Sequence, residues 1–256
     1  MHAPDRKTSL VMLHGLFGPL DYFDPASLLP HLDVHCPSLP GYGSVPPLPE
    51  REVTLEALAG EMVDRIRREP AGPVWLLGHS LGGAVAMLVA HTAPELVSGI
   101  VNVEGNFTLK DAFWTGRIAS LPAEAWSAEY DAMKADPPGW LRRAGIDPTP
   151  ERAARAAHIL GYQPAPVVRA VARALVHGTG DASYLERVRA VVERGVPVAL
   201  VAGARSAAAW DVPAWVRDAS RTYRVQPGVG HMMMLEDPEG FCRIVGEVVP
   251  AQGPGR

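Results

Sequence analysis

Short apolar runs recur along the chain, and the segments between them carry apolar residues at helical spacing. Each run has the length and composition of a strand that is buried on both faces of a sheet. Between the second and third runs, Leu55, Leu58, Met62 and Ile66 repeat at intervals of three or four, which predicts an amphipathic helix. This alternation predicts an α/β fold, a mostly parallel sheet with helices on both faces. The runs cover residues 9–13, 32–36, 74–77, 100–103, 196–202 and, more weakly, 222–225.

Residues 107–180 contain no run of this kind. Within them, Thr149-Pro150 predicts the start of a helix, with proline at the first helical position. A second helix start is predicted by the capping-box pattern that begins at Ser183. We therefore expect residues 107–180 to form a helical cap over the edge of the sheet where the strands end. Residues 1–106 and 181–256 would then form the core.

The composition is that of a globular protein. Of 256 residues, 47% are hydrophobic and 20% are charged, which is enough to bury a core without disulfides and is unlike a disordered chain. The net charge of -4 gives no electrostatic reason to expect a nucleic acid or an anionic membrane as a partner. No apolar run is long enough for a signal peptide or a membrane span, and there are only two cysteines. We therefore expect a cytoplasmic protein with reduced thiols.

Residues 78–82, with the sequence GHSLG, match the pattern G-x-S-x-G and lie directly between an apolar run and a helical segment. In that context the pattern predicts a sharp turn that strains the backbone of Ser80 and exposes its hydroxyl. The alternative interpretation is that Ser80 only caps a helix. We expect Ser80 to be a nucleophile.

His231 follows the last apolar run, in the sequence PGVGH. A histidine can take the proton of a serine near neutral pH and return it later, so a serine nucleophile needs such a partner. By itself, a lone histidine in this place would be an ordinary turn residue. Its position after Ser80 in the chain favours His231 as the base. His79 is expected to pack beside the site, and His14 to shape a loop.

With two further motifs, HGLFG at residues 14–18 and PGYGS at residues 40–44, the sequence resembles the α/β-hydrolase superfamily along nearly the whole chain. In that superfamily, backbone N–H groups of the HG loop and of the residue after the nucleophile bind the oxyanion. The resemblance implies that Leu16 and Leu81 supply an oxyanion hole here. Each such donor contributes roughly 3–4 kcal/mol of transition-state stabilisation.

The sequence departs from the superfamily at the third member of the triad. The usual carboxylate follows the strand predicted at 196–202, where this chain has Ser206, which cannot stabilise an imidazolium by charge. Two carboxylates could replace it: Glu104, directly after the run at 100–103, and Asp211 in a longer loop. Some superfamily members, including certain haloalkane dehalogenases, carry their acid on the strand that corresponds to residues 100–103 of this chain. We expect Glu104 to be the acid because a strand end holds a carboxylate more firmly than a loop, with Asp211 as the alternative.

These residues predict a serine hydrolase of the carboxylesterase, thioesterase or lactonase type, acting on a small hydrophobic acyl or lactone substrate through an acyl-enzyme. A carbon–carbon bond hydrolase, an acyl transferase or a cyclase with the same triad stays open, as does a non-catalytic binding protein with this fold. The dehalogenases and epoxide hydrolases of the superfamily use aspartate at the position of Ser80, which argues against both. No metal or nucleotide motif is present, so we expect no cofactor.

Overall fold

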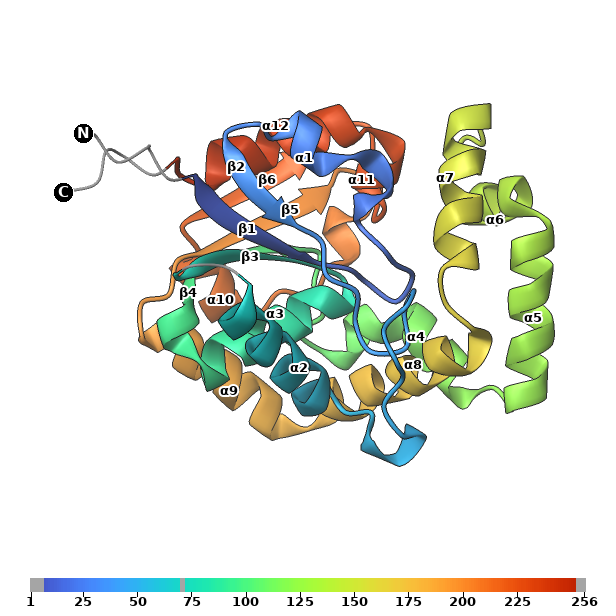
Figure 1. Ribbon diagram of the computed structural model, residues 1–256, viewed down its shortest axis with the longest axis horizontal. Helices are drawn as coiled ribbons and strands as arrows, with labels where there is room; N and C mark the ends of the chain where they lie inside the picture. The colour runs from blue at the N-terminus through green and yellow to red at the C-terminus, as the bar shows by residue number, and fades with distance from the viewer. Residues whose placement is uncertain (1–6, 70–71, 252–256) are drawn as a thin grey trace.

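A computed structural model describes residues 7–69 and 72–251 and contains one six-stranded sheet (Figure 1). All neighbouring strands are parallel, in the order β2-β1-β3-β4-β5-β6. The predicted α/β class with a mostly parallel sheet is therefore confirmed. The strands are β1 (Thr8–Leu13), β2 (Leu32–His35), β3 (Val74–His79), β4 (Val97–Val103), β5 (Val198–Gly203) and β6 (Thr222–Gln226).

Helices cover both faces of the sheet (Figure 1). Helices α2, α3 and α9 lie on one face, and α1 and α12 lie on the other. The 3-10 helices are η1 (Asp21–Phe23), η2 (Glu50–Glu52), η3 (Pro94–Leu96), η4 (Leu109–Ala112) and η5 (Ala207–Ala209). The α-helices are α1 (Pro25–Leu28), α2 (Leu55–Arg68), α3 (Leu81–Thr92), α4 (Phe113–Ser120), α5 (Ala123–Ala135), α6 (Pro137–Arg143), α7 (Pro150–Gly161), α8 (Ala165–Gly180), α9 (Ala182–Glu193), α10 (Ala214–Ala219), α11 (Met233–Glu236) and α12 (Pro238–Val248).

The apolar runs of the sequence are continuous because the central strands are buried on both sides. Along β1, Val11 and Leu13 pack into the cluster beneath α2 and α3, whereas Leu10 and Met12 pack into the cluster beneath α12. Successive side chains of a strand point to opposite faces, so a strand between two helical layers needs apolar residues at every position.

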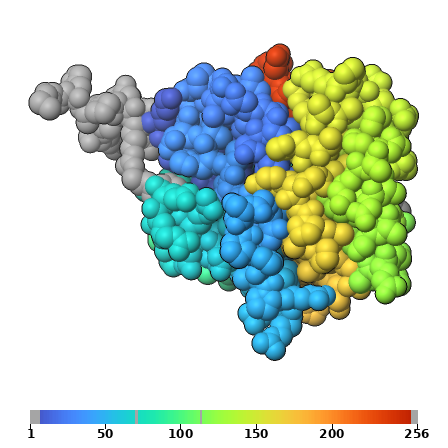
Figure 2. All heavy atoms as spheres, turned by 45° about the vertical axis from the view of Figure 1, so that its right-hand side comes forward, coloured from blue at the N-terminus to red at the C-terminus, as the bar shows by residue number. Residues whose placement is uncertain are grey.

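Between β4 and β5 the chain forms only helices, η4 and α4 to α9. Helices α5 to α7 form a layer along one side of the molecule, coloured green to yellow in Figure 2. Their buried residues, Trp126 and Trp140 among them, belong to the same hydrophobic cluster as one face of the sheet. This layer and the sheet therefore share a continuous core.

The helix starts test two predictions from capping patterns. Thr149 does cap α7: its hydroxyl accepts a hydrogen bond from the amide of Arg152 at 3.3 Å. The start predicted at Ser183 is wrong, because α9 begins at Ala182 and is capped by the carboxylate of Asp181, which accepts from the Ser183 amide at 2.8 Å. Aspartate and serine are both good N-caps, so the pattern alone could not choose between neighbouring positions.

Within residues 7–69 and 72–251, none of the helices combines the length and the apolar character needed to cross a membrane. Both cysteine thiols are free; Cys242 is buried and Cys36 is half-buried.

The first turn of α3 packs against the end of β1, which gives a test of this fold. A Cβ atom at Gly82 would lie 2.2 Å from the carbonyl oxygen of Leu13. Gly82→Ala should therefore destabilise the protein by about 1–3 kcal/mol or more, because backbone must move to admit the methyl group. Gly60→Ala is the matched control: nothing lies within 4 Å of its added Cβ on α2, and stability should rise by about 0.5–1 kcal/mol. Urea unfolding measures both, and equal effects would contradict this packing.

Candidate active site

Ser80 lies on the turn between β3 and α3, with φ 52° and ψ -121°. A positive φ is rare for a residue with a side chain and costs of order 1–3 kcal/mol, so the surroundings must enforce it. The Ser80 amide donates to the carbonyl of Val103 at 3.0 Å, and the Ser80 carbonyl accepts from Gly83 at 2.9 Å and from Asn106 at 3.3 Å. These backbone bonds fix the turn between two adjacent strand ends.

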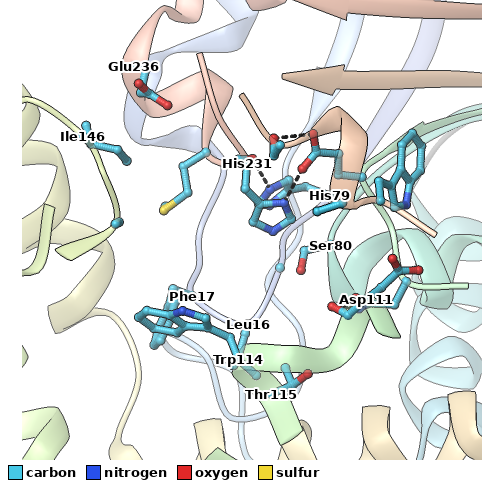
Figure 3. A pocket seen from close by; sticks show the side chains of 18 of the residues that line it. Leu16, Phe17, His79, Ser80, Asp111, Trp114, Thr115, Ile146, His231 and Glu236 are labelled. Atoms are coloured by element: carbon cyan, nitrogen blue, oxygen red, sulfur yellow. Dashed lines mark hydrogen bonds and ion pairs between the residues drawn. The ribbon is translucent and has the colours of Figure 1, made fainter. Parts of the chain in front are cut away.

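Ser80 opens into a pocket of about 380 Å³ (Figure 3). One wall comes from the sheet and its loops, with Ser80, Glu104 and His231, and the opposite wall comes from the helices between β4 and β5. In Figure 3, Phe17, Trp114 and Ile146 lie to one side of Ser80, and Asp111 lies to the other. The apolar lining residues are Leu16, Phe17, Trp114, Trp140, Ala144, Ile146, Ala209, Trp210 and Met232.

The carboxylate of Glu104 contacts His231. Its Oε2 accepts from His231 Nδ1 at 2.7 Å, while its Oε1 accepts from the Gly203 amide at 2.8 Å and from the Ser206 hydroxyl at 2.6 Å. Burial opposes ionisation of Glu104, but the hydrogen bonds from His231, Ser206 and Gly203 together outweigh it and lower the pKa of the carboxyl. Glu104 is therefore a carboxylate at neutral pH, held in a fixed position.

His231 is partly open to the pocket, with 46% of its side chain exposed. Because Nδ1 donates to Glu104, Nε2 of the neutral ring is free to accept a proton. Ser80 lies next to this ring in Figure 3, although no hydrogen bond joins the two side chains in the described structure. Such nucleophile–base contacts are often loose and tighten in substrate complexes.

Asp211, the alternative acid, makes other contacts. Its carboxylate accepts from the Thr108 hydroxyl at 2.7 Å and pairs with the Lys110 ammonium at 3.5 Å. Its amide donates to Asp111 at 2.7 Å. The structure thus brings Glu104, and not Asp211, to His231.

His79 and His14 lie beside the site as neutral rings. Burial and the charge of His231 lower the pKa of His79 to about 3, and its Nε2 donates to the backbone carbonyl of His231 at 3.0 Å. Burial lowers the pKa of His14 to about 4. Its Nδ1 donates to the Gly15 carbonyl at 2.8 Å, and its Nε2 accepts from the Leu39 amide at 3.1 Å. Both rings position loops around Ser80.

The loop after β1 passes close to Ser80: a Cβ on Gly15 would lie 3.2 Å from the Ser80 Cβ. The Tyr42 hydroxyl donates to the Leu16 carbonyl at 2.9 Å and fixes this loop. Among residues 7–69 and 72–251, no acceptor satisfies the amide N–H of Leu16 or of Leu81. These two donors therefore stay available to an oxygen atom placed at Ser80.

Sequence reasoning missed a pair that supports the His231 loop. The buried carboxylate of Glu236 accepts from the Gly230 amide at 2.8 Å and from Arg205 at 2.7 Å. Arg205 also donates to the carbonyl of Gly145 at 3.3 Å, in the loop between α6 and α7. The only feature of the sequence that pointed to this pair was the position of Glu236, directly after the apolar residues MMML.

Across the described part of the chain, no group of three or more histidine, cysteine, aspartate or glutamate side chains is arranged to hold a metal ion.

Comparisons with known proteins agree on the fold. A sequence model of the "Alpha/beta hydrolase family" matches residues 10–244. An uncharacterized protein of Mycobacterium tuberculosis is 28% identical over 249 residues, covering 86% of this chain and 68% of its own length. A pimeloyl-(acyl-carrier protein) methyl ester esterase of Sodalis glossinidius is 37% identical over 110 residues, or 42% of this chain and 40% of the esterase.

Solved structures share the fold over nearly the whole chain. One comes from a study of carboxylesterases of Nitrososphaera gargenis and superposes with a TM-score of 0.73 at 19% identity, covering 95% of this chain and 90% of that one. A mutant of the N-acyl homoserine lactonase AidH, complexed with N-hexanoyl homoserine, gives a TM-score of 0.66 at 19% identity and covers 98% and 93%. At these identities the similarity is one of fold.

The bond between Tyr42 and Leu16 gives a test of the loop geometry. Tyr42→Phe should lower stability by about 1–3 kcal/mol, because the buried carbonyl of Leu16 loses its donor. Tyr22→Phe is the matched control, since its buried hydroxyl has no hydrogen-bond partner in the described structure and its removal should be neutral or stabilising. Urea unfolding compares the two variants, and equal losses would refute the role of the Tyr42 hydroxyl.

Proposed function

Because the chain belongs to the α/β-hydrolase family, we propose that it is a serine hydrolase that cleaves an ester, thioester or lactone of a hydrophobic substrate through an acyl-enzyme. The observation that carries this proposal is the 2.7 Å hydrogen bond between Glu104 and His231 at the pocket that also contains Ser80. A buried carboxylate, a partly exposed imidazole and a serine on a strained turn are the parts that acyl transfer requires.

In the proposed reaction, His231 Nε2 takes the proton of the Ser80 hydroxyl as Oγ attacks the carbonyl carbon. The negative charge of the tetrahedral intermediate is bound by the amides of Leu16 and Leu81. The imidazolium then protonates the departing alkoxide or thiolate, which leaves an ester on Ser80. Water attacks this ester with His231 again as the base, and collapse of the second intermediate releases the acid and regenerates Ser80.

Glu104 acts by holding His231. Its negative charge fixes the Nδ1–H tautomer, aims Nε2 at the pocket and stabilises the imidazolium that forms in each half-reaction. The absence of a carboxylate at position 206 was the reason to consider a non-catalytic binding protein. The contact of Glu104 with His231 supports an enzyme instead.

The lining of the pocket supports a hydrophobic substrate. Phe17 contacts Trp114 and Trp140 edge-on, with ring centroids 6.3 Å and 5.9 Å apart. These aromatic residues offer a large apolar surface next to Ser80. We infer that the helices within residues 107–180 act as the cap that binds the apolar part of the substrate. The ester and lactone named for related proteins fit the same substrate class.

The nucleophile is tested by removing its hydroxyl. Ser80→Ala should lower kcat for p-nitrophenyl esters about 10⁴-fold or more, because no covalent intermediate can form. A fluorophosphonate probe should label the wild type at Ser80, as located by peptide mass spectrometry, and should leave the variant unlabelled. Full activity of Ser80→Ala would overturn the assignment, and an unlabelled wild type would favour a binding protein.

The acid is tested by a matched pair of isosteric variants. Glu104→Gln should lower kcat about 10²- to 10⁴-fold, because an amide neither stabilises the imidazolium nor enforces the Nδ1–H tautomer. Asp211→Asn should change kcat little, since an amide oxygen can still accept from the Thr108 hydroxyl and only the half-exposed ion pair with Lys110 is lost. Steady-state ester hydrolysis at one pH compares the two. A severe loss confined to Asp211→Asn would show that Asp211 is the acid.

A further inference from the structure

Ser206 stands after β5, at the position where the α/β-hydrolase superfamily usually carries its triad carboxylate. Here the hydroxyl of Ser206 contacts the carboxylate of Glu104, the residue proposed to act as the acid instead. Its Oγ lies 2.6 Å from Oε1 of Glu104. Building on the proposed function, we propose that Ser206 is a positioning residue: it locks the Glu104 carboxylate in the orientation that presents Oε2 to His231.

Such a positioning residue matters because the carboxylate of a glutamate rotates easily about the last bond of its side chain. The last torsion of a Glu side chain is broad, so the hydrogen bonds to its two oxygens set the orientation of the carboxylate, and each bond narrows its rotation. Here Oε2 has one donor, His231, whereas Oε1 has two, the Ser206 hydroxyl and the Gly203 amide. The two bonds to Oε1 leave Oε2 as the oxygen that faces the imidazole.

The distances favour Glu104 as the acceptor of the Ser206 proton. The other acceptor within reach is the carbonyl of Gly203, at 3.3 Å from Ser206 Oγ. An O–H···O⁻ bond to a carboxylate is typically 2.5–2.7 Å long and stronger than a neutral one, in agreement with the contact to Glu104. Ser206 therefore does more than close the turn after β5.

A neutral donor suits this position for electrostatic reasons. The titratable groups that interact electrostatically with Glu104 are His231, the neutral His79 and the phenol of Tyr223 on β6. An aspartate at position 206 would place a second negative charge against Glu104, and two adjacent carboxylates would share one proton. A hydroxyl supplies a hydrogen bond and leaves the single charge for His231.

The test compares Ser206→Ala with Ser206→Thr, which keeps a hydroxyl. Ser206→Ala should lower kcat for p-nitrophenyl esters about 10- to 100-fold with little change in KM, since the loss concerns orientation and not substrate contact. The acid limb of its kcat/KM profile should move to lower pH, because a carboxylate that is no longer held towards His231 stabilises the imidazolium less. Ser206→Thr should restore both kcat and the pH profile.

Ser220→Ala is the control variant, because the Ser220 hydroxyl donates only to the Arg217 carbonyl at 2.7 Å, away from the pocket. Its kcat and pH profile should equal those of the wild type. An unchanged kcat and acid limb in Ser206→Ala would overturn the proposal. So would a loss that Ser206→Thr does not restore while urea unfolding shows both variants to be folded.

A readout that needs no turnover separates this proposal from the proposed function. The proton on His231 Nδ1 gives a downfield NMR resonance whose position reports its hydrogen bond to Glu104. Ser206→Ala should shift this resonance, and Ser220→Ala should not. A wild type that neither hydrolyses esters nor reacts with the fluorophosphonate would refute the hydrolase, whereas an unshifted resonance in Ser206→Ala would refute the role of Ser206.

Discussion

The arrangement around the pocket depends on keeping one buried carboxylate ionised. Burial of Glu104 works against its charge, and the hydrogen bond and charge of His231, together with the hydrogen bonds from Ser206 and Gly203, reverse that effect and lower the pKa of the carboxyl. The penalty for removing a charge from water is several kcal/mol, so each donor must be in place. Those donors come from the end of β5, from the loop after β5 and from the loop after β6, while Glu104 follows β4. The three loops are therefore coupled through a single side chain.

The parallel sheet makes this coupling possible because it brings consecutive strand ends to one edge. Backbone bonds continue past the strands: the Ser80 amide donates to Val103, and the Glu104 amide donates to Val201, both at 3.0 Å. Ser80 and Glu104 each have a positive φ, 52° and 41°, at the residue where the chain leaves its strand. The same kind of backbone turn at the end of each strand thus directs both side chains out of the sheet and towards the pocket.

Much of the fold could be predicted from the sequence because it depends on local patterns. Continuous apolar runs specify strands between two helical layers, and all six are present. The contacts of the site could not be predicted in the same way. Whether Glu104 or Asp211 reaches His231 depends on Thr108 and Lys110, which lie about 100 positions before Asp211 and take up its carboxylate. The support of the His231 loop by Arg205 and Glu236 likewise joins residues that no local pattern connects.

Arg205 and Ser206, the two residues after Ala204, contact different buried carboxylates. Arg205 extends to Glu236 and Gly145 and so ties the His231 loop to the helices opposite the sheet. Ser206 contacts Glu104 instead. A carboxylate at position 206 would repel Glu104, because the Ser206 hydroxyl lies 2.6 Å from that carboxylate. With Glu104 directly after β4, a cation at position 205 and a neutral hydroxyl at position 206 leave Glu236 paired with Arg205 and Glu104 paired with His231.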